Sequence, residues 1–279
     1  MEILRSLEAM REWRASLAPD QCVGFAPTMG NLHAGHTELI KTAKHRSDAV
    51  VASIFVNPMQ FDGNEDLGAY PRTLEADLEK LEAAGATAVF TPATTDIYPD
   101  GLSQHTTVNV PGLTDVLCGA SRPDHFRGVT TVVSKLFGIV RPNIAVFGAK
   151  DLQQVLVIKK MVRDLSIHTE IDVIPTVRET DGLAMSSRNG YLGHDERALA
   201  PLFSRTLEEA ANRIAQSGSD IGTVIAQSKA VLADAGFIVD YLEARHTCDL
   251  SYASSLNQET AIFGAVFLGT TRLIDNRIV

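Results

Sequence analysis

The chain of 279 residues is long enough to bury a large core and is predicted to form two domains. Its hydrophobic content of 45% and charged content of 21% are typical of a soluble protein. The net charge of −9, with no block of Lys or Arg, argues against a general nucleic-acid binder or a protein of anionic membranes. A nucleotide substrate remains compatible with this charge, because it needs only a local cationic pocket.

The cysteines and the amino terminus predict a cytoplasmic location. Cys22, Cys118 and Cys248 are scattered without close pairing, which indicates a reducing compartment. Residues 1–5 lack the basic and apolar regions of a signal peptide. No apolar run reaches the roughly 18 residues of a membrane-spanning helix.

Residues 1–175 alternate between helix-like and strand-like patterns. Helices are predicted over 2–18, 36–46, 73–84, 127–140 and 151–165, with Thr73 and Asp151 as N-caps and Gly85 as a terminator. Strands are predicted over 22–26, 49–55, 88–90, 144–147 and 171–174. This alternation predicts an α/β domain with a mostly parallel sheet, helices on both faces and ligands at the carboxyl ends of the strands.

Residues 176–279 have a different pattern. Two amphipathic helices, over 195–215 and 219–234, precede strand-like runs over 237–244, 260–268 and 273–279. Helices followed by adjacent strands favour a small α+β domain. We therefore predict domains over 1–175 and 176–279, with the boundary near residues 175–182.

Two histidines, His33 and His36, lie where the strand at 22–26 turns into a helix, between Gly30 and Gly35. A helix start offers unpaired N–H groups to phosphate, glycines allow close approach, and histidines supply donors. The alternatives are an ordinary core or surface pair, or a metal site. Metal is less favoured because zinc needs three or four ligands and the cysteines are scattered.

Polar residues also follow two other strands. Asn57 and Gln60 come after the strand at 49–55, where neutral amides suit a polar or carboxylate substrate, although Asn-Pro also signals a plain turn. Residues 148–151, Gly-Ala-Lys-Asp, form a second strand–turn–helix phosphate candidate, in which Asp151 caps the helix, binds a ribose hydroxyl or helps to hold Mg²⁺. One of Gln153 and Gln154 should face the same cleft.

Two further segments carry cations. Residues 185–189, Met-Ser-Ser-Arg-Asn, combine hydroxyls and a guanidinium as a polyphosphate clamp would, although a polar surface turn has the same composition. Residues 121–129 place Arg122 and His125 before a helix and Arg127 near its start. A cation at that end of a helix favours an anionic ligand nearby, with plain solvation as the alternative.

The motifs 33–36 (His-Ala-Gly-His) and 185–188 (Met-Ser-Ser-Arg) resemble the paired signatures of the nucleotidyltransferase superfamily, which includes the class I aminoacyl-tRNA synthetases. Six segments in order resemble the pantothenate synthetase (pantoate–β-alanine ligase) family, and the match extends over nearly the whole chain, including Arg272–Asn276. The six segments are 27–36, 55–61, 70–73, 121–129, 147–154 and 181–192.

The resemblance implies a ligase that makes pantothenate from pantoate and β-alanine with ATP, a Rossmann-like first domain and a homodimer. It implies that His36 is the proton donor, that Gln60 contacts pantoate and the β-alanine site, and that Gln154 contacts pantoate. It assigns ATP binding to Met29, Gly30, Asn31, Leu32, His33, Ala34, Gly35, His36, Gly148, Ala149, Lys150, Asp151, Val177, Met185, Ser186, Ser187 and Arg188. Ala149 departs from the acidic or polar residue of many relatives, which puts only a side-chain contact in doubt.

The expected chemistry is attack of the pantoate carboxylate on the α-phosphate, followed by aminolysis of pantoyl adenylate by β-alanine. His33, His36, Lys150 and Arg188 would neutralise the developing charge, and Asn57 and Arg127 would join the substrate-binding residues. Mg²⁺ would bridge phosphate oxygens without being held firmly by protein side chains. The loops over 62–72 and 182–190 are candidates for covering the site.

Two alternatives remain at this stage. Another nucleotidyltransferase would release pyrophosphate but no AMP, and a non-catalytic nucleotide-binding module would bind ATP without turnover. A tRNA ligase is disfavoured by the acidic charge balance and the short chain. We expect only small-molecule substrates, with neither nucleic acid nor membrane as a partner.

Overall fold

The computed structural model describes residues 1–61, 67–68, 70–216 and 220–279. Its first sheet has six parallel strands in the order β1-β4-β3-β2-β5-β6. The strands are β1 (Glu2–Leu4), β2 (Val23–Thr28), β3 (Ala49–Ile54), β4 (Ala88–Phe90), β5 (Ile144–Gly148) and β6 (Glu170–Ile174). The predicted parallel α/β architecture is confirmed.

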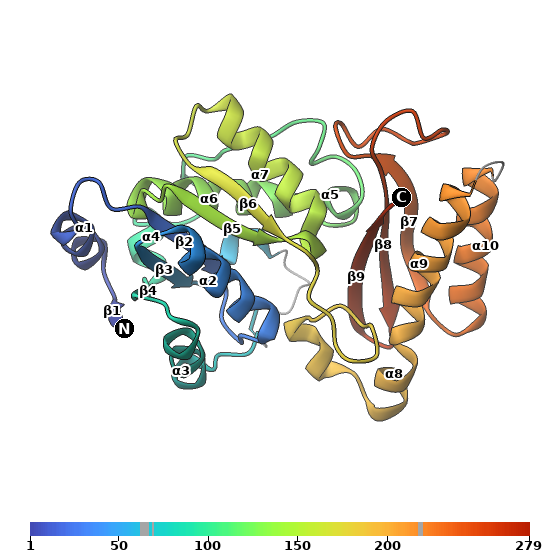
Figure 1. Ribbon diagram of the computed structural model, residues 1–279, viewed down its shortest axis with the longest axis horizontal. Helices are drawn as coiled ribbons and strands as arrows, with labels where there is room; N and C mark the ends of the chain where they lie inside the picture. The colour runs from blue at the N-terminus through green and yellow to red at the C-terminus, as the bar shows by residue number, and fades with distance from the viewer. Residues whose placement is uncertain (62–66, 69, 217–219) are drawn as a thin grey trace.

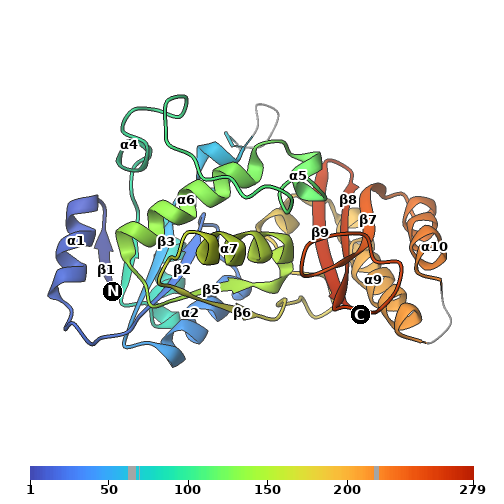
Figure 2. The ribbon, with the colours of Figure 1, turned by 90° about the horizontal axis from the view of Figure 1, so that it is seen from above.

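Helices cover both faces of this sheet (Figures 1 and 2). One core joins the sheet to α1 (Leu7–Ser16), α6 (His125–Val140) and α7 (Leu152–Asp164), and another joins it to α2 (Ala34–Arg46) and α3 (Leu74–Ala84). Successive residues of β3 show the division, since Val51 packs in the first core and Val50 in the second. Two short helices, α4 (Thr94–Ile97) and α5 (Cys118–Ser121), lie in the connection between β4 and α6.

The second sheet is antiparallel, in the order β7 (Ile238–His246), β8 (Thr260–Leu268), β9 (Thr271–Ile278). α9 (Pro201–Ala215) and α10 (Ile221–Asp234) pack on one face of it, and α8 (His194–Leu199) precedes them. The opposite face joins the first core through Ala261 and Phe263 of β8. β9 is the strand nearest the first sheet (Figures 1 and 2).

Several predicted boundaries were wrong. Residues 2–4 form an edge strand, because they pair with β4, and the first helix starts only at Leu7, after an N-cap bond from Ala9 N–H to Ser6 Oγ of 3.1 Å. The helix predicted over 195–215 is two helices, because Pro201 begins a new one as its first residue. The helix predicted from residue 127 starts at His125, and β7 and β9 each extend two residues beyond their predicted bounds, to His246 and from Thr271.

The caps were only partly predicted. Gly85 ends α3 in the left-handed conformation, with φ of 96°, as expected. Thr73 precedes α3 without a capping bond, because its hydroxyl donates to Asp77 instead. Asp151 makes no capping bond to α7 either, since residues Ala149–Asp151 form a 3₁₀ turn, η2, that leads directly into the helix.

Candidate active site

A cleft opens at the carboxyl ends of β2, β3 and β5, where parallel sheets of this kind bind ligands. The space in and at the mouth of this cleft that no protein atom fills, open solvent included, is about 1040 Å³. The cleft is lined by Pro27, Thr28, Met29, His33, His36, Leu39, Phe55, Asn57, Gln60, Tyr70, Val129, Val132, Val133, Leu136, Phe147, Gly148, Lys150, Asp151, Gln154, Ser186, Ser187 and Arg188. Residues from four candidate segments, 33–36, 57–60, 148–151 and 185–189, therefore meet in one cleft.

The two histidines at the start of α2 are fixed by backbone hydrogen bonds. Nδ1 of His33, the N-cap residue, accepts from Gly35 N–H at 3.1 Å, and Nδ1 of His36 accepts from His33 N–H at 3.3 Å. Because each Nδ1 accepts, the proton of each neutral imidazole lies on Nε2. Both Nε2–H groups are then donors for a ligand in the cleft.

Both imidazoles are held in the neutral form. Burial lowers the pKa of His33 to about 4, with a further lowering contribution from the positive charge of Lys150. Burial is also the main reason why the pKa of His36 is held well below its usual value, followed by the repulsion that a protonated His33 would exert and by the charge of Lys150. A polyphosphate would reverse part of this shift, because its negative charge favours the protonated form.

The turn that leads into α2 and ends at His33, here called the histidine turn, is supported by α3. The sequence reasoning missed this contact. Asp77 is fully buried and accepts hydrogen bonds from the N–H groups of Asn31 and Leu32, both at 2.8 Å. Gly30, with φ of 85°, and Asn31, with φ of 50°, shape this turn. A signal was present, since Asp77 occupies a position between Leu74 and Leu81 on the apolar face of its helix, where a carboxylate needs partners.

Neutral amides line the cleft after β3, in the 3₁₀ turn η1 (Pro58–Gln60) and just before it. Asn57 is 1% exposed; its Oδ1 accepts from the hydroxyl of Tyr98 at 2.7 Å, and its Nδ2 donates to Gly128 O at 3.1 Å and to Gln60 Oε1 at 3.2 Å. These bonds orient both amides. The NH₂ group of Gln60 contacts Met29 Sδ at 2.9 Å, a weak acceptor that a substrate carboxylate or hydroxyl would outcompete.

The second half of the cleft comes from residues 148–151 and 186–188. In the turn η2, Nζ of Lys150 lies 3.7 Å from Oδ2 of Asp151. Ser187, the first residue of the 3₁₀ helix η3 (Ser187–Tyr191), donates from Oγ to Asn31 O at 3.0 Å, and Asn31 Nδ2 donates to Ser187 O at 3.4 Å. The loop over 185–188 is thereby joined to the histidine turn, 156 residues away in the sequence.

The structure separates neighbouring candidates. Gln154 lines the cleft, whereas Gln153 is buried and binds the backbone of Leu113, Val116 and Cys118. Arg127 does not line the cleft; its side chain is 46% exposed and pairs with Asp124 at 3.1 Å. The cation at this helix start therefore has a carboxylate next to it, where we expected an anionic ligand.

The other predicted nucleotide residues lie beside the cleft without lining it: Gly30, Asn31, Leu32, Ala34, Gly35, Ala149, Val177 and Met185. Leu32 is 3% exposed and packs in the core under the histidine turn. Val177 O accepts from Met185 N–H at 3.0 Å, which closes the loop that leads to Ser186.

The charges in the cleft suit a polyanion in an otherwise acidic protein. Of the described residues that line it, Lys150 and Arg188 are cationic and Asp151 alone is acidic. Among the residues in the described ranges, no group of three or more His, Cys, Asp or Glu side chains is arranged to hold a metal ion.

The turn that carries His33, the turn η2 with Lys150 (the lysine turn) and the loop over 185–188 (the serine–arginine loop) meet at one cleft, at the carboxyl ends of a parallel sheet. This arrangement defines an α/β protein whose cleft suits the phosphates of a nucleotide. The chain belongs to the pantoate–beta-alanine ligase family, whose sequence model matches residues 2–278.

The relatives agree with this assignment. The chain is 56% identical to the pantothenate synthetase of Shewanella sp. strain ANA-3, over 96% of this chain and 94% of the relative. It is 52% identical to the pantothenate synthetase of Idiomarina loihiensis, over 99% and 97%.

Two solved structures share the fold over the full length. The pantothenate synthetase of Thermus thermophilus superposes with a TM-score of 0.93 at 41% identity, covering 99% of both chains. The pantoate–beta-alanine ligase of Francisella tularensis, solved with beta-gamma ATP and beta-alanine, superposes with a TM-score of 0.84 at 36% identity, covering 100% of this chain and 97% of that one. The predicted family and fold class are confirmed.

Proposed function

We propose that this protein condenses pantoate with β-alanine at the expense of ATP, releasing AMP and pyrophosphate through a pantoyl-adenylate intermediate. One observation supports this most directly: groups suited to phosphate, from His33, His36, Lys150 and residues 186–188, line the same cleft as the amides Asn57, Gln60 and Gln154. The relative from Francisella tularensis was solved with beta-gamma ATP and beta-alanine.

In the first step, a carboxylate oxygen of pantoate attacks the α-phosphate of ATP in line, and the bond to the β-phosphate oxygen breaks. Negative charge grows on the transferred phosphoryl group and on pyrophosphate. The Nε2–H groups of His33 and His36, together with Lys150 and Arg188, are placed to stabilise that charge, and Ser186 and Ser187 add hydroxyl donors. His36 is the proposed proton donor.

The amides Gln60 and Gln154 would hold pantoate. Neutral dipoles suit this task, because a strong cation at the same place would compete for the carboxylate that must attack phosphorus. In the second step, the amine of β-alanine attacks the acyl carbon of pantoyl adenylate, and the carbon–oxygen bond to AMP breaks. Holding both reactants in one cleft accelerates such a step, because the entropy cost of bringing them together is met on binding.

We propose further that Mg²⁺ accompanies ATP, with Asp151 as the one described carboxylate that lines the cleft and could contact it, and that it screens phosphate charge when bound. Asn57 belongs to the proposed pantoate site through its bond to Gln60, whereas Arg127 pairs with Asp124. The proposed nucleotide-binding residues are those given above, with Val177 acting through its backbone.

Three broader expectations also stay proposals. We place a domain boundary at 175/176, directly after β6. Three free cysteines favour a cytoplasmic protein, and no described helix is long and apolar enough to cross a membrane. We expect a homodimer, which sedimentation equilibrium would test.

Lys150→Ala tests the proposed site directly. We expect adenylation to slow by about 10²–10³, because a cation that faces developing phosphate charge is lost while the fold is kept. The measurement is pantoate-dependent exchange of labelled pyrophosphate into ATP without β-alanine. Lys159→Ala, an exposed lysine on α7, is the matched control and should exchange at the parent rate. Equal rates for parent and Lys150→Ala would refute the role of Lys150.

AMP release, measured with pantoate and β-alanine omitted in turn, tests the reaction as a whole. We expect AMP only when both substrates are present with ATP. Pyrophosphate without AMP would identify a different nucleotidyltransferase, and ATP binding without turnover would identify a non-catalytic module.

A further inference from the structure

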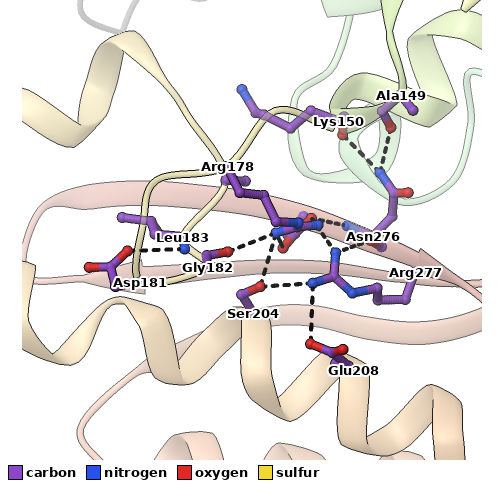
Figure 3. Close-up of polar contacts among 12 residues, drawn as sticks. Ala149, Lys150, Arg178, Asp181, Gly182, Leu183, Ser204, Glu208, Asn276 and Arg277 are labelled. Carbon is purple, nitrogen blue, oxygen red and sulfur yellow. Dashed lines mark hydrogen bonds and ion pairs between the residues drawn. The ribbon is translucent and has the colours of Figure 1, made fainter. Parts of the chain in front are cut away.

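A single side chain from the second sheet contacts the backbone on both sides of Lys150. Asn276 of β9 donates from Nδ2 to Ala149 O at 2.8 Å and to Lys150 O at 2.9 Å (Figure 3). Asn276 is 7% exposed, so these bonds are shielded from water. The two carbonyls belong to the two peptide units that flank the Cα atom of Lys150, and each takes one of the two amide hydrogens.

This arrangement restrains the backbone of Lys150. Rotation about φ turns one of the flanking peptide units and rotation about ψ turns the other, so either movement breaks a hydrogen bond to Asn276. The side chain of Lys150 extends away from Asn276 (Figure 3), toward the cleft that it lines. The side chain of Asn276 thus bonds the backbone on either side of Lys150 and restrains the direction in which the lysine side chain leaves the backbone.

The neighbouring residue on β9, Asp275, connects this strand to the segment before the loop over 185–188, which forms the other side of the cleft. Asp275 is 3% exposed and accepts two hydrogen bonds from Arg178, at 2.7 and 2.9 Å. Arg178 also donates to Gly182 O at 3.1 Å, in the segment that leads to the loop over 185–188 (Figure 3). β9 is therefore the common support of the lysine turn and of the serine–arginine loop.

We propose that Asn276 is a positioning residue for Lys150 and that, through it, the second sheet sets the geometry of adenylation. The inference rests on the proposed function, since it assigns Lys150 to the phosphates. Asn276 does not line the cleft that His33 and His36 line, but with Lys150, Asp151 and Gln154 it lines a smaller hollow beside it. Its side chain bonds the backbone of Ala149 and Lys150, so we expect its effect on adenylation to pass mainly through Lys150.

The test is a double-mutant cycle on the adenylation half-reaction. We expect Asn276→Ala to lower the pyrophosphate-exchange rate by about 10- to 100-fold with an unchanged KM for pantoate, because a displaced lysine weakens the transition state more than pantoate binding. In the Lys150→Ala background, the same change should lower the rate less than about twofold, since the group that it positions is gone.

Asn143→Ala is the matched control. Asn143 also bonds the backbone of a neighbouring strand, through Oδ1 to Val23 N–H at 2.8 Å, but at the amino ends of the strands, away from the cleft. It should lower thermal stability and leave exchange at the parent rate.

Two outcomes would overturn the positioning role. In one, Asn276→Ala costs the same factor with and without Lys150; in the other, its loss of exchange is matched by Asn143→Ala. A normal rate in Lys150→Ala itself would also overturn the inference, because it would refute the proposed role of Lys150, whereas an absence of pantoate-dependent exchange in the parent protein would contradict the proposed function.

Discussion

Burial decides the protonation state of the histidines at and beside this cleft. Burial lowers the pKa of His125 to about 3, with a further lowering contribution from the adjacent Arg122. Its Nδ1 donates to Gln60 O at 2.8 Å, and its Nε2 accepts from Arg122 at 3.1 Å, which defines the neutral tautomer opposite to that of His33. Three neutral histidines therefore lie at or beside the cleft, and each has one ring nitrogen engaged by the backbone.

These low pKa values predict that acid weakens the fold. Above about pH 6.5 a histidine is neutral in both the folded and the unfolded chain and contributes nothing to pH dependence. Below that pH, His125 is protonated in the unfolded chain but stays neutral in the folded one. The free energy of unfolding therefore falls by about 1.4 kcal/mol per pH unit for each such histidine, down to the pKa of the folded state.

Urea unfolding between pH 4 and 7.5 measures this slope. We expect the slope of the free energy of unfolding against pH to be shallower in His125→Gln, by about 1.4 kcal/mol per pH unit between pH 6.5 and 4. The reason is that glutamine does not bind a proton in this range. His194→Gln, an exposed histidine on α8, should keep the parent slope. Identical slopes for parent and His125→Gln would contradict the neutral assignment.

At the scale of elements, the contact between α6 and η1 positions the side-chain amides of Asn57 and Gln60. Gly128 of α6 lies so close to η1 that a Cβ atom there would come within 2.3 Å of Met59 O and 2.6 Å of Gln60 N. Gly128 O also accepts from Asn57. The glycine thus allows a helix to pack directly on the turn that carries Gln60.

Gly128→Ala should therefore displace η1. We expect KM for pantoate to rise about tenfold or more, because the amide of Gln60 moves, with a loss of stability of about 1–3 kcal/mol from overpacking. Gly138→Ala, on the same helix and with open space around its Cβ position, is the control and should be neutral or slightly stabilising. The packing argument fails if the two variants have the same KM for pantoate.

At the scale of the whole molecule, a buried ion pair joins the segment after β6 to the second sheet. The side chain of Asp275 is 1% exposed and that of Arg178 is 20% exposed. Burial raises the pKa of Asp275, and Arg178 opposes that rise. Because both groups have largely left water, the loss of one partner is more damaging than the loss of a surface pair.

Asp275→Asn tests this contribution. We expect the free energy of unfolding to fall by about 3–5 kcal/mol, because the guanidinium of Arg178 loses its charged partner in a largely buried place. Asp164→Asn removes the partner of Lys160 and Arg163 at the surface and should cost much less, because water and salt screen exposed pairs. Urea denaturation of both variants at pH 7 decides the matter, and equal losses would show that burial adds nothing to this pair.

Much of the fold could be predicted because its signals are local. The apolar runs of β2, β3 and β5 are buried on both faces, so they appear in the sequence as continuous hydrophobic stretches. β1 was missed because three residues of an edge strand carry no period long enough to be distinguished from the helix that follows. The break at Pro201 was missed because the apolar stripe continues across it.

Local pattern and the family resemblance together determined the parallel sheet, its ligand-binding edge and the segments that supply His33, His36, Lys150 and residues 186–188. Tertiary structure alone decided which of Gln153 and Gln154 faces the cleft. It also decided that Asp77 supports the turn before His33 and that Asn276 supports the turn with Lys150. The physical reason is that these outcomes depend on hydrogen-bond partners 35 to 127 residues away, which no local pattern in the sequence specifies.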